Sequence, residues 1–227
     1  TPWCPNSSDA LATTMGMNVG IEYDCSGLGN NGTRVGNFSW SSDTPRYLSS
    51  TQFNGGKYIE IPFPCKTISE NLTVSIWGYE ENWNTPSAER LIGAAFNTSG
   101  WCIGDYGSEN SLFGFYANGS YNTALGFKQL SSGWHHFVIT FNGYNLQYYV
   151  DSEQFYSKTF STRQVVTGDY NIIIGRHANG GCYFNGRISD VRIYATALSA
   201  DDVKSLYQNS AYIDSSGNVY GAVHEEV

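Results

Sequence analysis

The sequence predicts an all-β protein, a two-sheet antiparallel β-sandwich with one short helix on its C-terminal side. Short strand-like runs recur along the chain, for example at 57–63 and 134–141. Clusters of Gly, Asn and Ser separate them, as at 26–32 and 178–181. Many short strands with such turns are typical of sandwiches and barrels. The 227 residues include 25 Gly and 17 Tyr, and charged residues are only 14%, a composition that favours strands and turns over helices.

Alternation along four of these runs predicts which side chains face the core. Neighbouring side chains of a strand point to opposite faces, so an aliphatic row on one parity marks the buried face. The predicted inward rows are Leu72, Val74 and Ile76; Phe137, Ile139 and Phe141; Leu146, Tyr148 and Val150; and Val191 and Ile193.

The one predicted helix covers residues 199–208. Ser199 is a good N-cap, and Asp201 and Asp202 lie in the first turn, where acidic side chains suit the helix dipole. Apolar residues at helical spacing predict a face that packs on the sandwich. We therefore divide the chain into a lead-in segment (1–18), the sandwich (19–208) and a terminal hairpin or linker tail (209–227).

Composition also bears on partners and compartment. The formal net charge is −8, which disfavours a nucleic-acid partner because phosphate contacts need clustered Lys and Arg. We find no apolar run of about 18 residues that would span a membrane. The chain begins at Thr1 without a basic and apolar leader, so we expect a mature form or a piece of a longer polypeptide.

The five cysteines leave two interpretations open. They are Cys4, Cys25, Cys65, Cys102 and Cys182, and their spacing does not suit a zinc site. Two disulfides with one free thiol would fit a secreted protein, whereas five free thiols would fit assembly in a reducing compartment.

The acidic residues do not predict a catalytic centre. A retaining glucanase needs two carboxylates about 5 Å apart, commonly provided by acids that alternate along one strand. Glu80 and Glu81 are adjacent, so in a strand they would point to opposite faces. The same rule separates His135 from His136, so the two rings cannot share a metal or relay a proton. We expect a protein without enzymatic activity, with glycoside hydrolysis as the less favoured alternative.

The outward rows predict a binding face. Aromatic rings stack on the C–H patches of sugars, and planar polar groups bond their hydroxyls. The predicted ligand-binding residues on the outward parity are Trp77, Tyr79, His136, Gln147, Tyr149, Arg192 and Tyr194. An alternative loop site consists of Trp83, Trp101, Tyr106 and Tyr183. For each residue, the competing interpretation is that loops or a second layer cover it, since Trp in particular is highly buried on average.

Several segments together resemble the laminin-G-like domains of the concanavalin-A-like lectin/glucanase superfamily. They are the early strand pair at 53–62, NLTVSIW at 71–77, the central hairpin at 133–141 with 149–151, and FNGRISDVRIYATAL at 184–198 with the helix after it. The resemblance covers residues 19–208. It implies a jelly-roll sandwich, and it is unspecific for function because lectins, receptor modules and glucanases share this fold. We expect a non-catalytic carbohydrate- or receptor-binding module.

Two departures from the family pattern concern a turn and a metal. Ser152 follows the Tyr-Val-Asp of the hairpin where the family often has Gly, so this turn is expected to differ. The pair Ser189 and Asp190 replaces an acidic pair that many members carry. We expect no cofactor. The alternative is a rim calcium held by Asp24 and Asp190, but these two residues are only two of the six to eight oxygen ligands that calcium takes.

A further resemblance concerns the source. The opening segment and the Ser-Ser-Gly-Asn tail at 215–218 resemble laminin-G-like domains in tail or capsid-surface proteins of bacteriophages. It implies an extracellular or virion-surface location, with a glycan or cell-surface receptor as partner. A structural or decoration domain that contacts other virion or surface proteins is the second candidate function.

Overall fold

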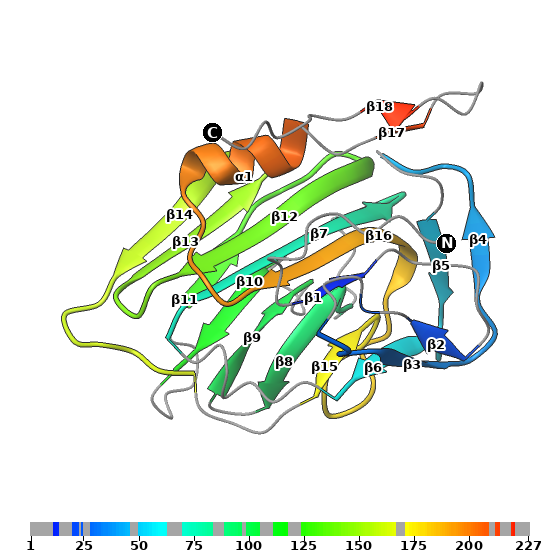
Figure 1. The fold of residues 1–227 in the computed structure, drawn as a ribbon, viewed down its shortest axis with the longest axis horizontal. Helices are drawn as coiled ribbons and strands as arrows, with labels where there is room; N and C mark the ends of the chain where they lie inside the picture. The colour runs from blue at the N-terminus through cyan, green and yellow to red at the C-terminus, as the bar shows by residue number, and fades with distance from the viewer. Residues whose placement is uncertain are drawn as a thin grey trace.

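The computed structural model describes most of the sandwich. The described residues are 11–13, 20–22, 24, 28–45, 50–62, 70–83, 89–96, 99–104, 111–117, 124–166, 171–208, 212–213 and 219–220. They form two eight-stranded sheets that pack face to face, with one helix against the outside (Figure 1). The predicted fold class is confirmed.

The first sheet, sheet A, has the order β14-β13-β12-β7-β16-β5-β4, and β1 pairs with β16. Its strands are β1 (Leu11–Thr13), β4 (Ser39–Ser41), β5 (Ser50–Asn54), β7 (Leu72–Glu80), β12 (Gly133–Phe141), β13 (Asn145–Val150), β14 (Glu153–Thr159) and β16 (Asn185–Tyr194). The pairings that join them are all antiparallel. The long strands β7, β12 and β16 therefore form the centre of this sheet.

The second sheet, sheet B, has the order β11-β10-β9-β8-β15-β6-β3-β2. Its strands are β2 (Ile21–Glu22), β3 (Gly32–Val35), β6 (Tyr58–Ile61), β8 (Ile92–Phe96), β9 (Ser99–Ile103), β10 (Ser111–Tyr116), β11 (Ala124–Phe127) and β15 (Ile172–Ile174). Near the C-terminus, β17 (Tyr212–Ile213) and β18 (Val219–Tyr220) pair with each other.

The core between the sheets contains the inward rows that alternation predicts. Every member of those four rows belongs to one buried cluster. Aromatic contacts join the sheets: Phe113 of β10 stacks on Tyr148 of β13 with centroids 4.8 Å apart, and Phe115 lies 4.5 Å from Phe141. Burial of these apolar surfaces is the main stabilising contribution to such a core.

Strand β16 departs from simple alternation at one place. Its register against β7 shifts between Ser189 and Arg192, and Asp190 has a positive φ of 46°. Such a bulge adds a residue to one strand. Ile188 and Val191 therefore both face the core, although they are three residues apart.

The helix α1 (Ala200–Gln208) packs on the outer face of sheet A (Figure 1). Its start is a reciprocal cap: the Asp202 amide donates to Ser199 Oγ at 3.2 Å, and the Ser199 amide donates to Asp202 Oδ2 at 2.9 Å. Val203 is fully buried against Val138 and Tyr149. Within the described part of the chain, no helix is long and apolar enough to cross a membrane.

Two of the five cysteines are described. Cys102 is buried and Cys182 is exposed, and both thiols are free. With these two thiols free, the other three cysteines allow at most one disulfide, so the interpretation with two disulfides is wrong. Cys4, Cys25 and Cys65 lie outside the described residues, so the interpretation with five free thiols stays a prediction.

Candidate functional site

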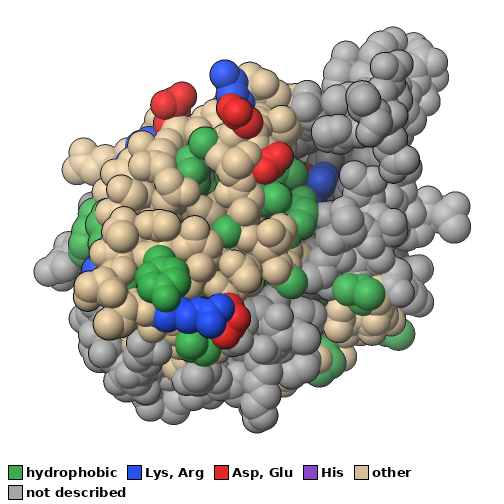
Figure 2. Space-filling view, turned by 60° about the vertical axis from the view of Figure 1, so that its left-hand side comes forward, with side chains coloured by type: hydrophobic (Ala, Val, Ile, Leu, Met, Phe, Trp, Pro, Cys, Tyr) green, Lys and Arg blue, Asp and Glu red, His purple; other side chains and the backbone are tan. Residues whose placement is uncertain are grey.

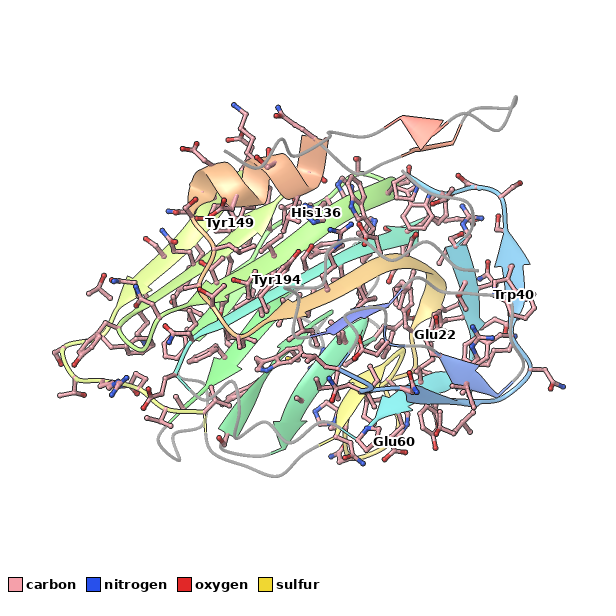
Figure 3. All side chains as sticks on the ribbon, in the orientation of Figure 1. Glu22, Trp40, Glu60, His136, Tyr149 and Tyr194 are labelled. Carbon is pink, nitrogen blue, oxygen red and sulfur yellow. The ribbon has the colours of Figure 1, made fainter. Side chains whose placement is uncertain are left out.

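The predicted outward row does not form an exposed platform in its middle, because α1 covers it. Trp77, His136 and Tyr149 point to the outer face, as predicted, but only 4%, 1% and 1% of their surfaces are exposed. Tyr207 of α1 stacks on Trp77 with centroids 5.4 Å apart. Figure 3 shows His136 and Tyr149 beside the helix. The expectation that these rings are open to solvent is wrong.

Three further members of that row, Arg192, Tyr194 and Gln147, are buried or half-buried. Arg192 and Tyr194 are each 9% exposed. The Arg192 guanidinium donates to Asp190 at 2.7 Å and 3.2 Å, and β1 pairs with β16 along this stretch. Gln147 is half-buried, and its Oε1 accepts from Tyr149 Oη at 3.1 Å. These residues offer little open surface to a ligand.

The alternative loop site does not assemble either. Trp83 and Trp101 belong to the core, and Trp83 Nε1 donates to the Gly133 carbonyl at 2.9 Å. Tyr183 is exposed, and Tyr106 lies outside the described residues. The competing interpretation, that the tryptophans are packing residues, holds for both.

One part of the outward row remains accessible, at the end of sheet A away from the helix contacts. Tyr79 of β7 lies in register between Arg187 of β16 and Trp134 of β12, and Tyr79 and Trp134 are half-buried. The Arg187 guanidinium carbon lies 3.7 Å from the Tyr79 ring centroid, a close cation–π contact. Asp43 holds Arg187 and Trp134 in place on either side of Tyr79, because it pairs with Arg187 and accepts a hydrogen bond from Trp134 Nε1 at 3.2 Å.

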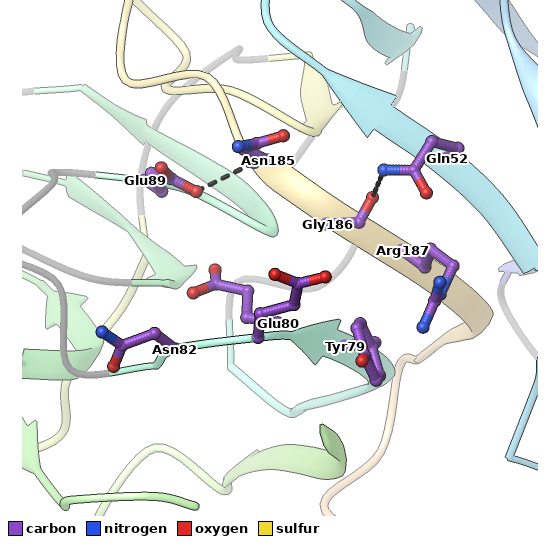
Figure 4. Close-up of a pocket in the computed structure, with 9 residues that line it drawn as sticks. Gln52, Tyr79, Glu80, Asn82, Glu89, Asn185, Gly186 and Arg187 are labelled. Atoms are coloured by element: carbon purple, nitrogen blue, oxygen red, sulfur yellow. Dashed lines mark hydrogen bonds between the residues drawn. The ribbon is translucent and has the colours of Figure 1, made fainter. Parts of the chain in front are cut away.

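A pocket of about 500 Å³ opens beside this group. It is lined by Gln52, Tyr79, Glu80, Glu81, Asn82, Glu89, Asn185, Gly186 and Arg187. Figure 4 shows Tyr79, Glu80 and Asn82 on one wall, with Asn185, Gly186 and Arg187 of β16 opposite them. Its volume falls in the range of small-ligand sites in proteins.

The floor of the pocket depends on Gly186. A Cβ atom there would lie 2.1 Å from the Tyr79 carbonyl oxygen and 2.6 Å from the Phe184 ring. Only glycine allows β16 and β7 to approach this closely. A glycine inside a strand can be a signal of such an approach, and it did not enter the sequence prediction.

Two glutamates that alternation would separate line the same pocket. Strand β7 ends at Glu80, so the rule of opposite faces does not extend to Glu81. Glu80 is buried, and Glu81 is exposed. The prediction that the two carboxylates do not form a catalytic pair stays a prediction.

Two polar side chains of the pocket, Gln52 and Glu89, are held by hydrogen bonds. Gln52 Nε2 donates to the carbonyls of Gly186 and Phe53, at 3.0 Å and 3.1 Å. Glu89 Oε2 accepts a hydrogen bond from the backbone N–H of Asn185 at 2.8 Å. The side chains are thus oriented before any ligand arrives, which lowers the entropic cost of binding.

Comparison with known families identifies the fold. The model of the concanavalin A-like lectin/glucanases superfamily matches residues 53–204. The chain belongs to this superfamily. No curated protein sequence matches it.

Solved structures with this laminin-G-like fold share little sequence with the chain. Domain 4 of AbnA, an extracellular arabinanase from Geobacillus stearothermophilus solved with arabinotriose, is 20% identical with a TM-score of 0.70, over 88% of this chain and 98% of that one. The binding domain of botulinum neurotoxin serotype D is 19% identical with a TM-score of 0.67, over 89% and 52%. The binding domain of botulinum neurotoxin DC in complex with SialylT is 19% identical with a TM-score of 0.65, over 93% of this chain and 54% of that one. The chain spans about half of the neurotoxin binding domains.

This laminin-G-like domain also contains a Ser-His-Asp arrangement, and its geometry is structural. His135 Nδ1 lies 2.6 Å from Asp151 Oδ2, and His135 Nε2 lies 3.4 Å from Ser131 Oγ. The same Nε2 lies closer, at 3.1 Å, to the Ser131 carbonyl oxygen. A carbonyl oxygen can only accept, so Nε2 carries a proton there and is not a base for the serine hydroxyl.

The environment of His135 agrees with a protonated ring. Burial alone would lower the pKa of His135, but the hydrogen bond and charge of Asp151 and the Ser131 carbonyl outweigh it, so the pKa is raised. Burial would raise the pKa of Asp151, but its contact with His135 and the hydrogen bond that it accepts from the His136 backbone amide lower the pKa below its ordinary value. The two groups form an ion pair that ties β12 to the turn after β13.

The two aspartates considered for calcium have local partners in the domain. Asp24 Oδ2 accepts from the Asn30 amide at 2.8 Å, and Asp190 binds Arg192. The described residues contain no group of three or more His, Cys, Asp or Glu side chains that would hold a metal. The expectation of no cofactor, with a rim calcium as its alternative, stays a prediction.

Proposed function

We propose that this chain is a non-catalytic carbohydrate-binding module that works on an extracellular surface. The observation that carries the proposal is the preorganised pocket at the end of β7, where amide and carboxylate groups meet Tyr79. Sugar sites in proteins combine an aromatic ring, which stacks on the sugar, with polar groups that bond its hydroxyls. Support also comes from the fold neighbours, which include an arabinanase domain solved with arabinotriose and a toxin binding domain solved with SialylT.

A binding role suits the pocket better than hydrolysis. A glycosidase keeps its acid protonated by placing it in an apolar site shielded from water. Here Glu81 and Asn82 are exposed, so water reaches that wall of the pocket. The virion-surface location and the decoration role that the sequence suggested stay predictions.

A glycan array followed by calorimetry with the best hit tests the proposal. Asn185→Ala and Asn82→Ala remove exposed amides of the pocket and should lower affinity at least tenfold, a loss of about 1.4 kcal/mol. Thermal melting should show that both variants remain folded.

Glu153→Gln is the matched control, because Glu153 is an exposed residue of the edge strand β14. This variant should bind like the wild type. An array without any hit, or amide variants that bind as tightly as the control, would rule out the proposed site. Release of sugar from the bound oligosaccharide would contradict the non-catalytic role.

A further inference from the structure

Carboxylates outnumber cations in the described lining of the pocket. Glu80, Glu81 and Glu89 contribute carboxylates, and an ionised carboxylate only accepts. The Gln52 amide nitrogen is committed to two backbone carbonyls, so its Oε1 is the atom left for a ligand. The ligand groups that meet these carboxylates must therefore donate hydrogen bonds.

The one cation in the lining does not offset this excess. Arg187 is paired with Asp43 and stacked on Tyr79, so its charge is already matched by a carboxylate outside the pocket lining. An anionic sugar would therefore enter a site whose described lining has three glutamates and one arginine that is already paired. Like charges within a few ångströms disfavour binding, more strongly in a half-buried site than in water.

The charge of the rest of the molecule does not favour acidic ligands either. The whole chain has a formal net charge of −8. On the face shown in Figure 2, the described Lys and Arg side chains are few and do not gather in one patch. A long-range field that attracts acidic glycans is not expected from such a charge distribution.

From these observations we infer the class of ligand, an inference that rests on the proposed function. The pocket selects sugars without acidic groups, and it binds a sugar with a free amino group more tightly than the same sugar in its N-acetylated form. Hydroxyl and ammonium groups donate to the glutamates, whereas a carboxylate, sulfate or sialic acid would bring a negative charge next to these carboxylates.

The test is an array that holds neutral, amino-bearing and acidic glycans, probed with the wild type and with the double variant Glu81→Gln/Glu89→Gln. The wild type should bind neutral and amino-bearing glycans and no acidic ones. Titration with chitotriose and N-acetylchitotriose should give about tenfold tighter binding of the amine form, as expected for a few partly exposed charge pairs. High salt should reduce that ratio.

The double variant keeps one acceptor oxygen on each side chain, replaces the other by an NH2 donor, and removes two charges. The ratio of its affinities for the amine and N-acetylated forms should fall from about ten to about one, because the two charges that favour the amine are removed. Hits that are mainly sialylated, sulfated or uronic glycans would overturn the charge inference and leave the binding function standing. An amine preference unchanged in the double variant would also overturn it. Absence of every hit would instead overturn the proposed function.

Discussion

Tyr149 shows how a correct face assignment can give a wrong environment. Its ring points away from the core between the sheets, as alternation predicts, yet it is 1% exposed because it packs on Val138 and Val203. We expect Tyr149→Ala to lower the free energy of unfolding by about 3 kcal/mol, the usual cost of removing a buried aromatic ring.

Urea unfolding measures this change, and Tyr149→Phe is its control. The phenylalanine keeps the ring and loses only the hydroxyl that bonds Gln147, so it should cost about 1 kcal/mol. A Tyr149→Ala domain as stable as the wild type would mean that α1 does not cover this face in solution.

His135 and Asp151 should make stability depend on pH. The raised pKa of His135 means that its contribution is fully present below the unfolded value of about 6.5 and is lost as pH rises through the folded pKa. The lowered pKa of Asp151 means that its contribution is present above about pH 4 and is lost as pH falls through the folded pKa. The pair therefore stabilises the domain most between about pH 4 and 6.5.

Denaturant unfolding at pH 6 and pH 8 tests this coupling. Asp151→Asn is the matched variant, because Asn tolerates the positive φ of 52° at this position and its side-chain oxygen can still accept from the His136 amide. The loss of stability from pH 6 to pH 8 should be smaller in the variant than in the wild type. Equal losses in both proteins would show that other groups set the pH dependence.

At the scale of elements, the turn between β13 and β14 carries a local strain. Asp151 and Ser152 both have positive φ, 52° and 67°, which is the backbone of a two-residue type I′ hairpin. Glycine adopts this conformation without the penalty that a Cβ atom brings. We expect Ser152→Gly to raise the free energy of unfolding by about 1 kcal/mol, measured by thermal or urea unfolding.

The matched control for this turn is Ser161→Gly, since Ser161 is an exposed serine outside any strand and has no positive φ. That substitution should destabilise slightly, because glycine only adds freedom to the unfolded chain there. A Ser152→Gly variant less stable than the wild type would show that the serine side chain, rather than the backbone, matters in the turn.

The strands and the helix could be predicted from the sequence, whereas the surface on which the helix docks could not. Strands and the helix follow from periodicity and from the Ser199 cap, which are local signals, so they could be predicted. The place where α1 docks is set by its packing against Trp77 and Tyr149 from other strands. An amphipathic pattern shows that a helix packs, without showing on which surface.

The pocket was missed for a related reason. Glu81 lies just after the last residue of β7, and the exact end of a strand is the least certain part of a sequence prediction. The pocket also needs the β16 residues Asn185 and Arg187, which are far from Glu81 in the chain and reach it only through the β16–β7 pairing. Of the predicted binding residues, only Tyr79 lines it.

At the scale of the whole molecule, the two sheets share one core and should unfold together. Ile139 lies in the middle of β12, opposite Val74 and Tyr148 on the neighbouring strands, and is fully buried. We expect Ile139→Ala to lower the free energy of unfolding by about 2–4 kcal/mol. Val191→Ala removes a smaller buried side chain of the same core and should lie at the low end of that range.

Far-ultraviolet circular dichroism and tryptophan fluorescence during urea unfolding test this expectation. Both probes should give one transition with the same midpoint, because the cluster that contains Ile139 also contains Trp101 of sheet B. Gln147→Ala is the control on the outer face of the same sheet, and it should cost less than about 1 kcal/mol. Two separate transitions would mean that the sheets are not one cooperative unit. A larger loss for Gln147→Ala than for Ile139→Ala would mean that the register is shifted by one residue, which exchanges the two faces of every strand.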